Sequence, residues 1–209
     1  MSWRSRGAFQ RRNPEAAKGR GAPGIGLRCF MEAREALAAG IESCKVLTGR
    51  FLAGFGDANR TSQAPGLPNH AAWTLGHLAL SFNAVANDLD GRGAPGAGFS
   101  REEPGFDPAG VAFDSVPDGD ATRYPDFARC LEIFDAACDR LGAAVRGASD
   151  AELQRIVKFG PFDVTKMWTI TFMIFHAGFH TGQLADLRRG LGMGRVLGDV
   201  ARVGGPRPG

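Results

Sequence analysis

The chain has no long apolar run and almost no segment with the alternating pattern of a β-strand. Its longest apolar stretch, from Met167 to Phe179, is shorter than the roughly 18 residues of a membrane helix and contains His176. β-Branched runs of period two are nearly absent, whereas the periodic segments are rich in Ala and Leu. We therefore expect an all-α protein without a membrane partner, whose core comes from the 44% of residues that are hydrophobic.

Cysteine is scarce, and its four residues form no CxxC pair. They are Cys29, Cys44, Cys130 and Cys138. We interpret them as small buried side chains in a reducing compartment, in preference to a disulfide or a thiol site. The N-terminus also lacks the apolar stretch of a secretory signal, and a twin-arginine signal is not convincing. A cytoplasmic location is therefore expected.

The net charge of +3 hides an uneven distribution. Residues 1–28 hold seven basic residues and one acid, whereas the rest of the chain holds 18 basic and 21 acidic residues. A mildly acidic remainder gives no basic face for nucleic acid, so no nucleic-acid partner is expected. The segment 1–28 is rich in Gly, Arg and Pro and is expected to be a disordered basic tail. Met31 is a plausible natural start, in which case this tail is not native.

Four long helices are expected in one domain that covers residues 30–195, followed by a flexible C-terminal tail over 196–209. Apolar residues recur every three or four positions over 30–55, 69–89, 124–146 and 164–191. Asn69 and Asp163 are expected to cap the second and fourth helices, and Ser149-Asp150-Ala151-Glu152 has the pattern of a capping box. The first half of the fourth helix is expected to be the most buried element, because apolar residues surround it.

The second and third helices are joined by a long connection, from Gly91 to Arg123, which is rich in Pro and Gly. Connections of this length are uncommon in compact domains. One interpretation is a crossover that lets the third helix run parallel to the second. The other is a lid over an active site.

The spacing of His176 and His180 is the strongest chemical signal. Residues four apart share one face of a helix, and two imidazoles at this spacing can bind one metal ion. His77 lies in another helical segment, and three imidazoles would leave coordination positions open. Gln183 lies on the face of His176 and His180, where it could orient a metal-bound group. The ligand set suits zinc, nickel, iron or manganese, so the ion stays open.

The alternative is that these histidines are structural, each with a backbone partner. The fourth, His70, is roughly 10.5 Å from His77 along a helix axis, too far to share a metal, and we interpret it as a surface or pocket-rim residue. Arg188 and Arg189 fit helix C-terminal cations better than a carboxylate site. Trp73 and Trp168 fit the core better than stacking platforms.

Two motifs together resemble the DinB/YfiT-like superfamily. The first is Trp73, two residues, then Gly76-His77-Leu78; the second is His176, three residues, His180, two residues, Gln183. The resemblance covers about residues 30–195 and implies a four-helix bundle in up-down-down-up order, with His77, His176 and His180 as metal ligands. Relatives include transferases that use bacillithiol or mycothiol, a maleylpyruvate isomerase and a domain of ergothioneine synthases. Homodimers are common, and many members have no established activity.

The sequence therefore predicts a DinB-like, metal-dependent enzyme that acts on a small electrophilic substrate. A site of three histidines would activate a thiol or water for transfer or hydrolysis, with a divalent metal and a low-molecular-weight thiol as cofactors. A thiol S-transferase or a hydrolase fits this description. The alternative is a stress-associated protein that binds a metal or small ligand without turnover, because no general base is evident in the sequence.

Overall fold

The computed structural model describes residues 32–92, 96–99 and 104–196. The chain divides into two units, residues 1–30 and 31–209, and everything described lies in the second. The expected disordered tail, Cys29 and most of the expected C-terminal tail lie outside the described residues. The elements in chain order are α1 (Ala33–Phe51), α2 (Ala71–Asp90), η1 (Ala109–Val111), η2 (Ala121–Arg123), α3 (Phe127–Gly147), α4 (Asp150–Gln154), β1 (Ile156–Phe159), β2 (Phe162–Thr165) and α5 (Lys166–Gly190).

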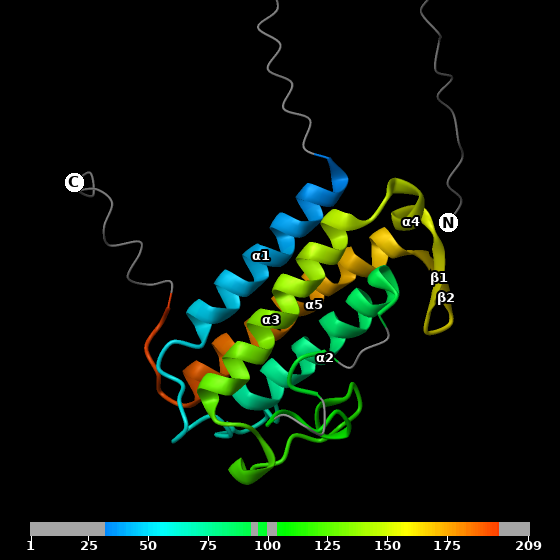
Figure 1. The fold of residues 1–209 in the computed structure, drawn as a ribbon. Coiled ribbons are helices and arrows are strands. Elements are labelled where there is room, and N and C mark those ends of the chain that lie inside the picture. Colours follow the sequence, from blue (N-terminus) through cyan, green and yellow to red (C-terminus); the bar gives the residue numbers. More distant parts are fainter. Residues whose placement is uncertain (1–31, 93–95, 100–103, 197–209) are drawn as a thin grey trace, which may run out of the picture. The chain divides into compact units, whose positions relative to one another are not determined.

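The described part of the chain is mostly helical, as its composition predicts. The long helices α1, α2, α3 and α5 run side by side (Figure 1): α3 packs against α1 and α2, and α5 packs against the same two helices. None of the helices in the described ranges combines the length and the apolar character that a membrane span needs. Each of these helices begins within three residues of its expected start.

Helix α1 buries one stripe, which follows from its three- and four-residue apolar spacing. Ala38, Ile41, Cys44 and Thr48 are its buried residues. Gly40 allows α5 to approach closely, because a Cβ there would lie 2.7 Å from the Cδ1 of Ile174. The helix ends before the expected Phe55.

The first turns of helix α2 are buried on nearly every side. All nine residues from Ala71 to Ala79 are buried, because α3, α5 and the connection after α2 cover them. The N-cap is His70, not the expected Asn69: its Nδ1 accepts a hydrogen bond from the Trp73 amide at 3.1 Å. His70 is fully buried, and its Nε2 donates to the Asp118 carbonyl at 2.9 Å. The interpretation of His70 as a surface residue was therefore wrong, because the connection covers the start of the helix.

The described parts of the connection between α2 and α3 fold back against α2. Phe106 and Val111 are buried there, and η1 packs on the helix. Gly76 permits this contact, since a Cβ at that position would come within 2.7 Å of Phe106 and 2.8 Å of Val111. The contact places the connection beside His77, the next residue along the helix.

Helices α3 and α4 follow the expected pattern. Asp126 caps α3 through the Arg129 amide at 2.7 Å, and the helix buries an apolar stripe that includes Phe134, Cys138 and Leu141. The expected cap at Ser149 is confirmed, because its Oγ accepts a hydrogen bond from the Glu152 backbone amide at 3.1 Å at the start of α4, whereas the Glu152 carboxylate binds Lys166 and Arg155 instead of closing the box.

The antiparallel hairpin β1–β2 was missed by the sequence analysis. Phe159 pairs with Phe162 across the turn at Gly160-Pro161, and Gly160 has φ +57°, a conformation that favours glycine. The strands extend to Thr165, which caps α5 through the Trp168 amide at 3.1 Å, so the expected cap Asp163 was wrong. The hairpin contacts the start of α5 (Figure 1).

One face of helix α5 is exposed, contrary to the expectation that its first half is the most buried element. Trp168, Phe175 and Phe179 are 43%, 66% and 54% exposed. Trp168 is therefore not a core residue, whereas Trp73 is buried as expected. The apolar residues that surround α5 in sequence include this solvent-facing stripe, which the helix does not bury against its neighbours.

Candidate metal centre

Three histidines from two helices converge inside the protein. His77 comes from α2, and His176 and His180 lie one turn apart on α5. The Nε2 atom of His176 lies 3.1 Å from that of His77 and 2.9 Å from that of His180. All three candidate ligand atoms lie within 4.8 Å of one another, so these residues could hold a metal ion. Tetrahedral nitrogen ligands at about 2.0–2.1 Å from zinc lie roughly 3.3 Å apart, which is close to this arrangement.

Two of the three imidazoles are oriented by acceptors on their other nitrogen. His77 Nδ1 donates to the Val111 carbonyl at 2.9 Å, and His180 Nδ1 donates to the Gln183 Oε1 at 2.8 Å. A proton on each Nδ1 leaves the lone pair on Nε2, which faces the centre of the cluster. This is the arrangement by which protein metal sites fix the tautomer of a histidine ligand.

Gln183 is placed behind His180 with respect to the cluster. Its Oε1 also accepts a hydrogen bond from the side-chain Nδ2 of Asn69 at 3.1 Å. These contacts make Gln183 a positioning residue for His180. Its expected catalytic role, to orient a metal-bound group, stays a prediction. Asn69, expected only as a helix cap, is part of the same hydrogen-bond chain.

Aromatic rings stack against two of the imidazoles. Trp73 stacks on His77 with ring centroids 4.6 Å apart and an interplanar angle of 7°. Phe172 lies nearly parallel to His176, with centroids 5.8 Å apart at 15°. Trp73 is itself held by a hydrogen bond from its Nε1 to Ser115 Oγ at 3.0 Å. The connection after α2 therefore supports His77 through both Val111 and Ser115.

Burial keeps the three imidazoles neutral. Desolvation, followed by the neighbouring His77, lowers the pKa of His176 from 6.5 to about 4. Desolvation and the other two imidazoles lower the pKa of His180 to about 3, and burial also lowers the pKa of His77. Neutral imidazole is the form that binds a metal, so the donor set fits a divalent cation without first losing protons at pH 7.

A cavity of about 950 Å³ leads to this cluster. His77 and His176 form part of its wall, and the rest is contributed by α2, by the hairpin, by Phe113 of the connection and by α5. Val111 accepts the hydrogen bond of His77 and Phe113 lines the cavity, so this part of the connection lies at the site, and the lid stays a prediction. The volume is within the range of small-molecule sites.

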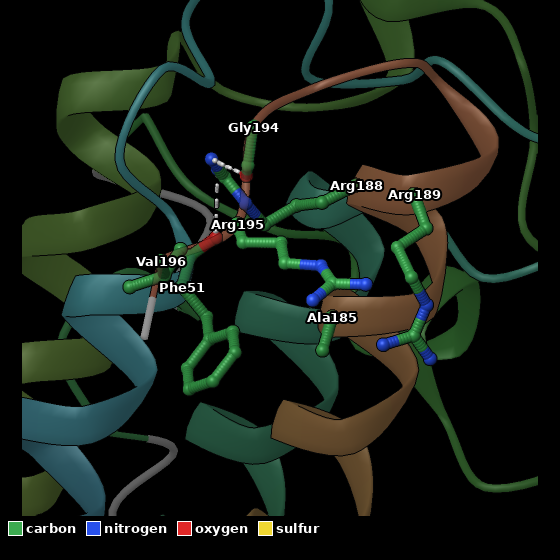
Figure 2. Close-up of a pocket in the computed structure, with 7 residues that line it drawn as sticks. All are labelled: Phe51, Ala185, Arg188, Arg189, Gly194, Arg195 and Val196. Atoms are coloured by element: carbon green, nitrogen blue, oxygen red, sulfur yellow. Dashed lines mark hydrogen bonds between the residues drawn. The ribbon is translucent and has the colours of Figure 1, made fainter. Parts of the chain in front are cut away.

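A second cavity, of about 480 Å³, lies near the other end of α5 and is lined by three arginines (Figure 2). The Arg188 guanidinium donates to the carbonyls of Phe51, Ala53 and Gly194, which join the end of α1 to the chain after α5. Arg188 lies in the last turn of α5, as expected of a helix C-terminal cation, and it is in addition a buried structural residue. Arg189 pairs with Asp186. The seven lining residues offer no histidine, cysteine or carboxylate to a metal.

A mostly helical fold and a cluster of three histidines, two of them buried, define a helical protein with a candidate metal centre. The sequence pattern of the DinB superfamily matches residues 12–184, so the chain belongs to that superfamily. The structure is similar to the crystal structure of the conserved protein of locus from Enterococcus faecalis, with a TM-score of 0.61 and 14% sequence identity over 78% of this chain and 99% of that one. This likeness shows the fold alone. No curated protein matches the sequence.

Proposed function

We propose that the protein is a metal-dependent enzyme in which His77, His176 and His180 hold a divalent cation. The observation that carries the proposal is the convergence of the three Nε2 atoms, with His77 and His176 also lining a cavity. A cation bound there would lower the pKa of a coordinated water or thiol and so supply a nucleophile near pH 7. The reaction class is attack by water or a low-molecular-weight thiol on a small electrophile, as a hydrolase or a thiol S-transferase.

In this reaction the chain's own residues would orient the histidine ligands and bind the substrate. Val111 and Gln183 hold His77 and His180 in the tautomer that presents Nε2. The cavity walls would exclude water from the substrate, and the three-nitrogen ligand set leaves coordination positions for reactants. The donors suit zinc, nickel, iron or manganese.

We also propose the arrangement and assembly that the family resemblance implies. The side-by-side packing of α1, α2, α3 and α5 supports a four-helix bundle, and the up-down-down-up order is what the resemblance implies. The exposed aromatic residues Phe175 and Phe179 on α5 support a homodimer. Cys44, Cys130 and Cys138 are buried free thiols, which supports a reducing, cytoplasmic location.

The metal site is tested by elemental analysis of the full chain purified without an affinity tag. The parent should carry about one divalent ion, and His176→Ala should carry none. His70→Asn is the matched control: it removes a histidine outside the cluster, keeps a side chain that can cap α2 and should retain the metal. Unchanged metal content in His176→Ala would defeat the assignment.

A second candidate function is a non-catalytic metal- or ligand-binding protein. One observation favours it: among the described residues that line the cavity, the only carboxylate is Asp88, which is paired with Arg155 and Lys166 and so is poorly suited to act as a base. A screen of thiols with electrophiles separates the two functions. Turnover that disappears in His77→Ala supports the enzyme, and the absence of turnover by metal-loaded protein across the screen supports the binding protein.

A further inference from the structure

The cavity that reaches the histidines is walled mainly by apolar side chains. Its aliphatic and aromatic contributors come from α2, the connection, the hairpin and α5. They are Leu80, Val85, Phe113, Ile156, Val157, Phe159, Phe172 and Met173. A ligand that fills about 950 Å³ and touches these groups gains most of its binding free energy from buried apolar surface.

Each charged residue on the cavity wall already has an opposite charge beside it. Asp88 lies 3.4 Å from Arg155 and 3.0 Å from Lys166. Arg155 also pairs with Glu152 at 3.2 Å, and Lys158 pairs with Asp163 at 2.8 Å. Within the described part of the chain, the wall therefore offers no unpaired cation that could bind an anionic substrate group.

The aromatic residues form a continuous path from the hairpin to the histidine cluster. Phe159 packs on Phe172 with centroids 4.8 Å apart, and Phe172 lies against the ring of His176. Trp168 also packs on Phe159, with ring centroids 5.3 Å apart. A flat apolar group that follows this wall would end at His176, where the proposed reaction would take place.

Two apolar side chains on the wall remain in water. Phe113, from the connection, is 90% exposed, and Ile156, from β1, is 58% exposed. Exposed apolar area of this kind is unfavourable unless a ligand covers it. Both residues belong to elements outside the four long helices, and both side chains are exposed, so a change of identity there should have little effect on folding.

We infer that the cavity takes an uncharged small molecule with an aromatic or similarly flat apolar body, and that Phe113 and Ile156 help to select it. As a statement about the substrate, this inference rests on the proposed function. As a statement about the cavity, it is independent of metal and turnover. The hairpin and the connection then determine specificity, while α2 and α5 carry the proposed metal chemistry.

The test uses the full chain and the uncharged fluorescent probe N-phenyl-1-naphthylamine, whose emission rises in an apolar site. We expect saturable binding by both metal-free and zinc-loaded protein. In the metal-free protein, displacement of the bound probe by 1-naphthamide should be at least tenfold more effective than displacement by the similarly shaped anion 1-naphthoate. Because only competition at the probe site is measured, an anion that binds the arginine-lined cavity in Figure 2 does not interfere.

Surface variants locate the probe. Phe113→Ser and Ile156→Ser should each weaken binding of N-phenyl-1-naphthylamine by about fivefold through lost apolar contact. Phe175→Ser is the matched control, because Phe175 is 66% exposed on α5 but does not line the cavity, and it should leave binding unchanged. Absence of saturable binding, equal displacement by amide and anion, or weakening only in Phe175→Ser would overturn the inference.

Metal analysis of the same samples separates the two proposals. Probe binding by protein that takes up no metal would leave the cavity inference standing and reject the proposed enzyme. Stoichiometric metal in protein that does not bind the probe would leave the proposed enzyme standing and reject the cavity inference.

Discussion

Acidification should destabilise the metal-free protein more than it would a protein with exposed histidines, because three buried or half-buried imidazoles are held in the neutral form. The pKa of His176 is lowered to about 4 and that of His180 to about 3, whereas both have a pKa near 6.5 in the unfolded chain. Between these values the unfolded chain binds more protons than the folded one. The stability is therefore fully present above pH 6.5 and is lost as the pH falls towards the folded values.

The magnitude follows from the width of that window. From about pH 6.5 to about pH 5, one imidazole that stays neutral in the folded state contributes about 2 kcal/mol of destabilisation. His180 is only 5% exposed and should contribute nearly this much, whereas the partly exposed His176 should contribute less. Together the two residues should account for about 3 kcal/mol.

The assay is urea unfolding with a chelator present at pH 7 and pH 5, for the parent and for the double variant His176→Gln/His180→Gln. Glutamine is polar and does not titrate, so the double variant should lose about 3 kcal/mol less than the parent on acidification. Each single variant should give an intermediate loss. An equal loss by the parent and the double variant would refute the reasoning, because protonation of the cluster would then not be what destabilises the fold.

Three further substitutions test the supports of the site. Gly76→Ala should lower the free energy of unfolding, measured with urea, by about 1–3 kcal/mol, because the new methyl group would lie less than 3 Å from side chains of the connection. Gly182→Ala on α5 is the control: its methyl group meets nothing within 4 Å, so it should not destabilise the protein. Gln183→Ala should weaken zinc binding by about 10–100-fold in a competition assay with a chelating dye, since His180 loses its acceptor; unchanged affinity would contradict this role. Lys166→Met should lower the free energy of unfolding by about 2 kcal/mol, because a 2%-exposed ammonium that joins α2, α4 and α5 is lost; an unaltered urea midpoint would show that these contacts do not contribute.

The periodic helices could be predicted from the sequence because their burial follows local spacing. Ile41 and Cys44 on α1, and Phe134 and Leu141 on α3, are buried at the positions that the three- and four-residue pattern indicates. The cap at Ser149 is equally local. Helix ends were less accurate, since the choice of cap depends on tertiary contacts: Asp118 holds the ring of His70, and the hairpin extends through Val164 to Thr165.

The hairpin left a signal that the sequence analysis did not use. Ile156, Val157, Phe159, Phe162 and Val164 are strand-forming residues around Gly160-Pro161, which is a turn sequence. The segment is too short to dominate a chain of long helical patterns. The hairpin matters because it lines the cavity, and a local sequence pattern cannot indicate that tertiary position. The exposed stripe on α5 was misjudged for the related reason that apolar character alone does not say which face has a neighbour.

The local spacing places His176 and His180 together, but it does not explain how the third histidine is held. The residues from Trp73 to His77 supply that explanation. Trp73 stacks on the imidazole, and Gly76 has no side chain to keep the connection away, so the carbonyl of Val111 reaches the Nδ1 of His77. A larger residue at position 76 would push the connection outward and remove the acceptor that directs Nε2 towards α5. Trp73, Gly76 and His77 thus act together to orient the imidazole. Their effect depends on Val111, which lies 34 positions after His77 and outside the motif.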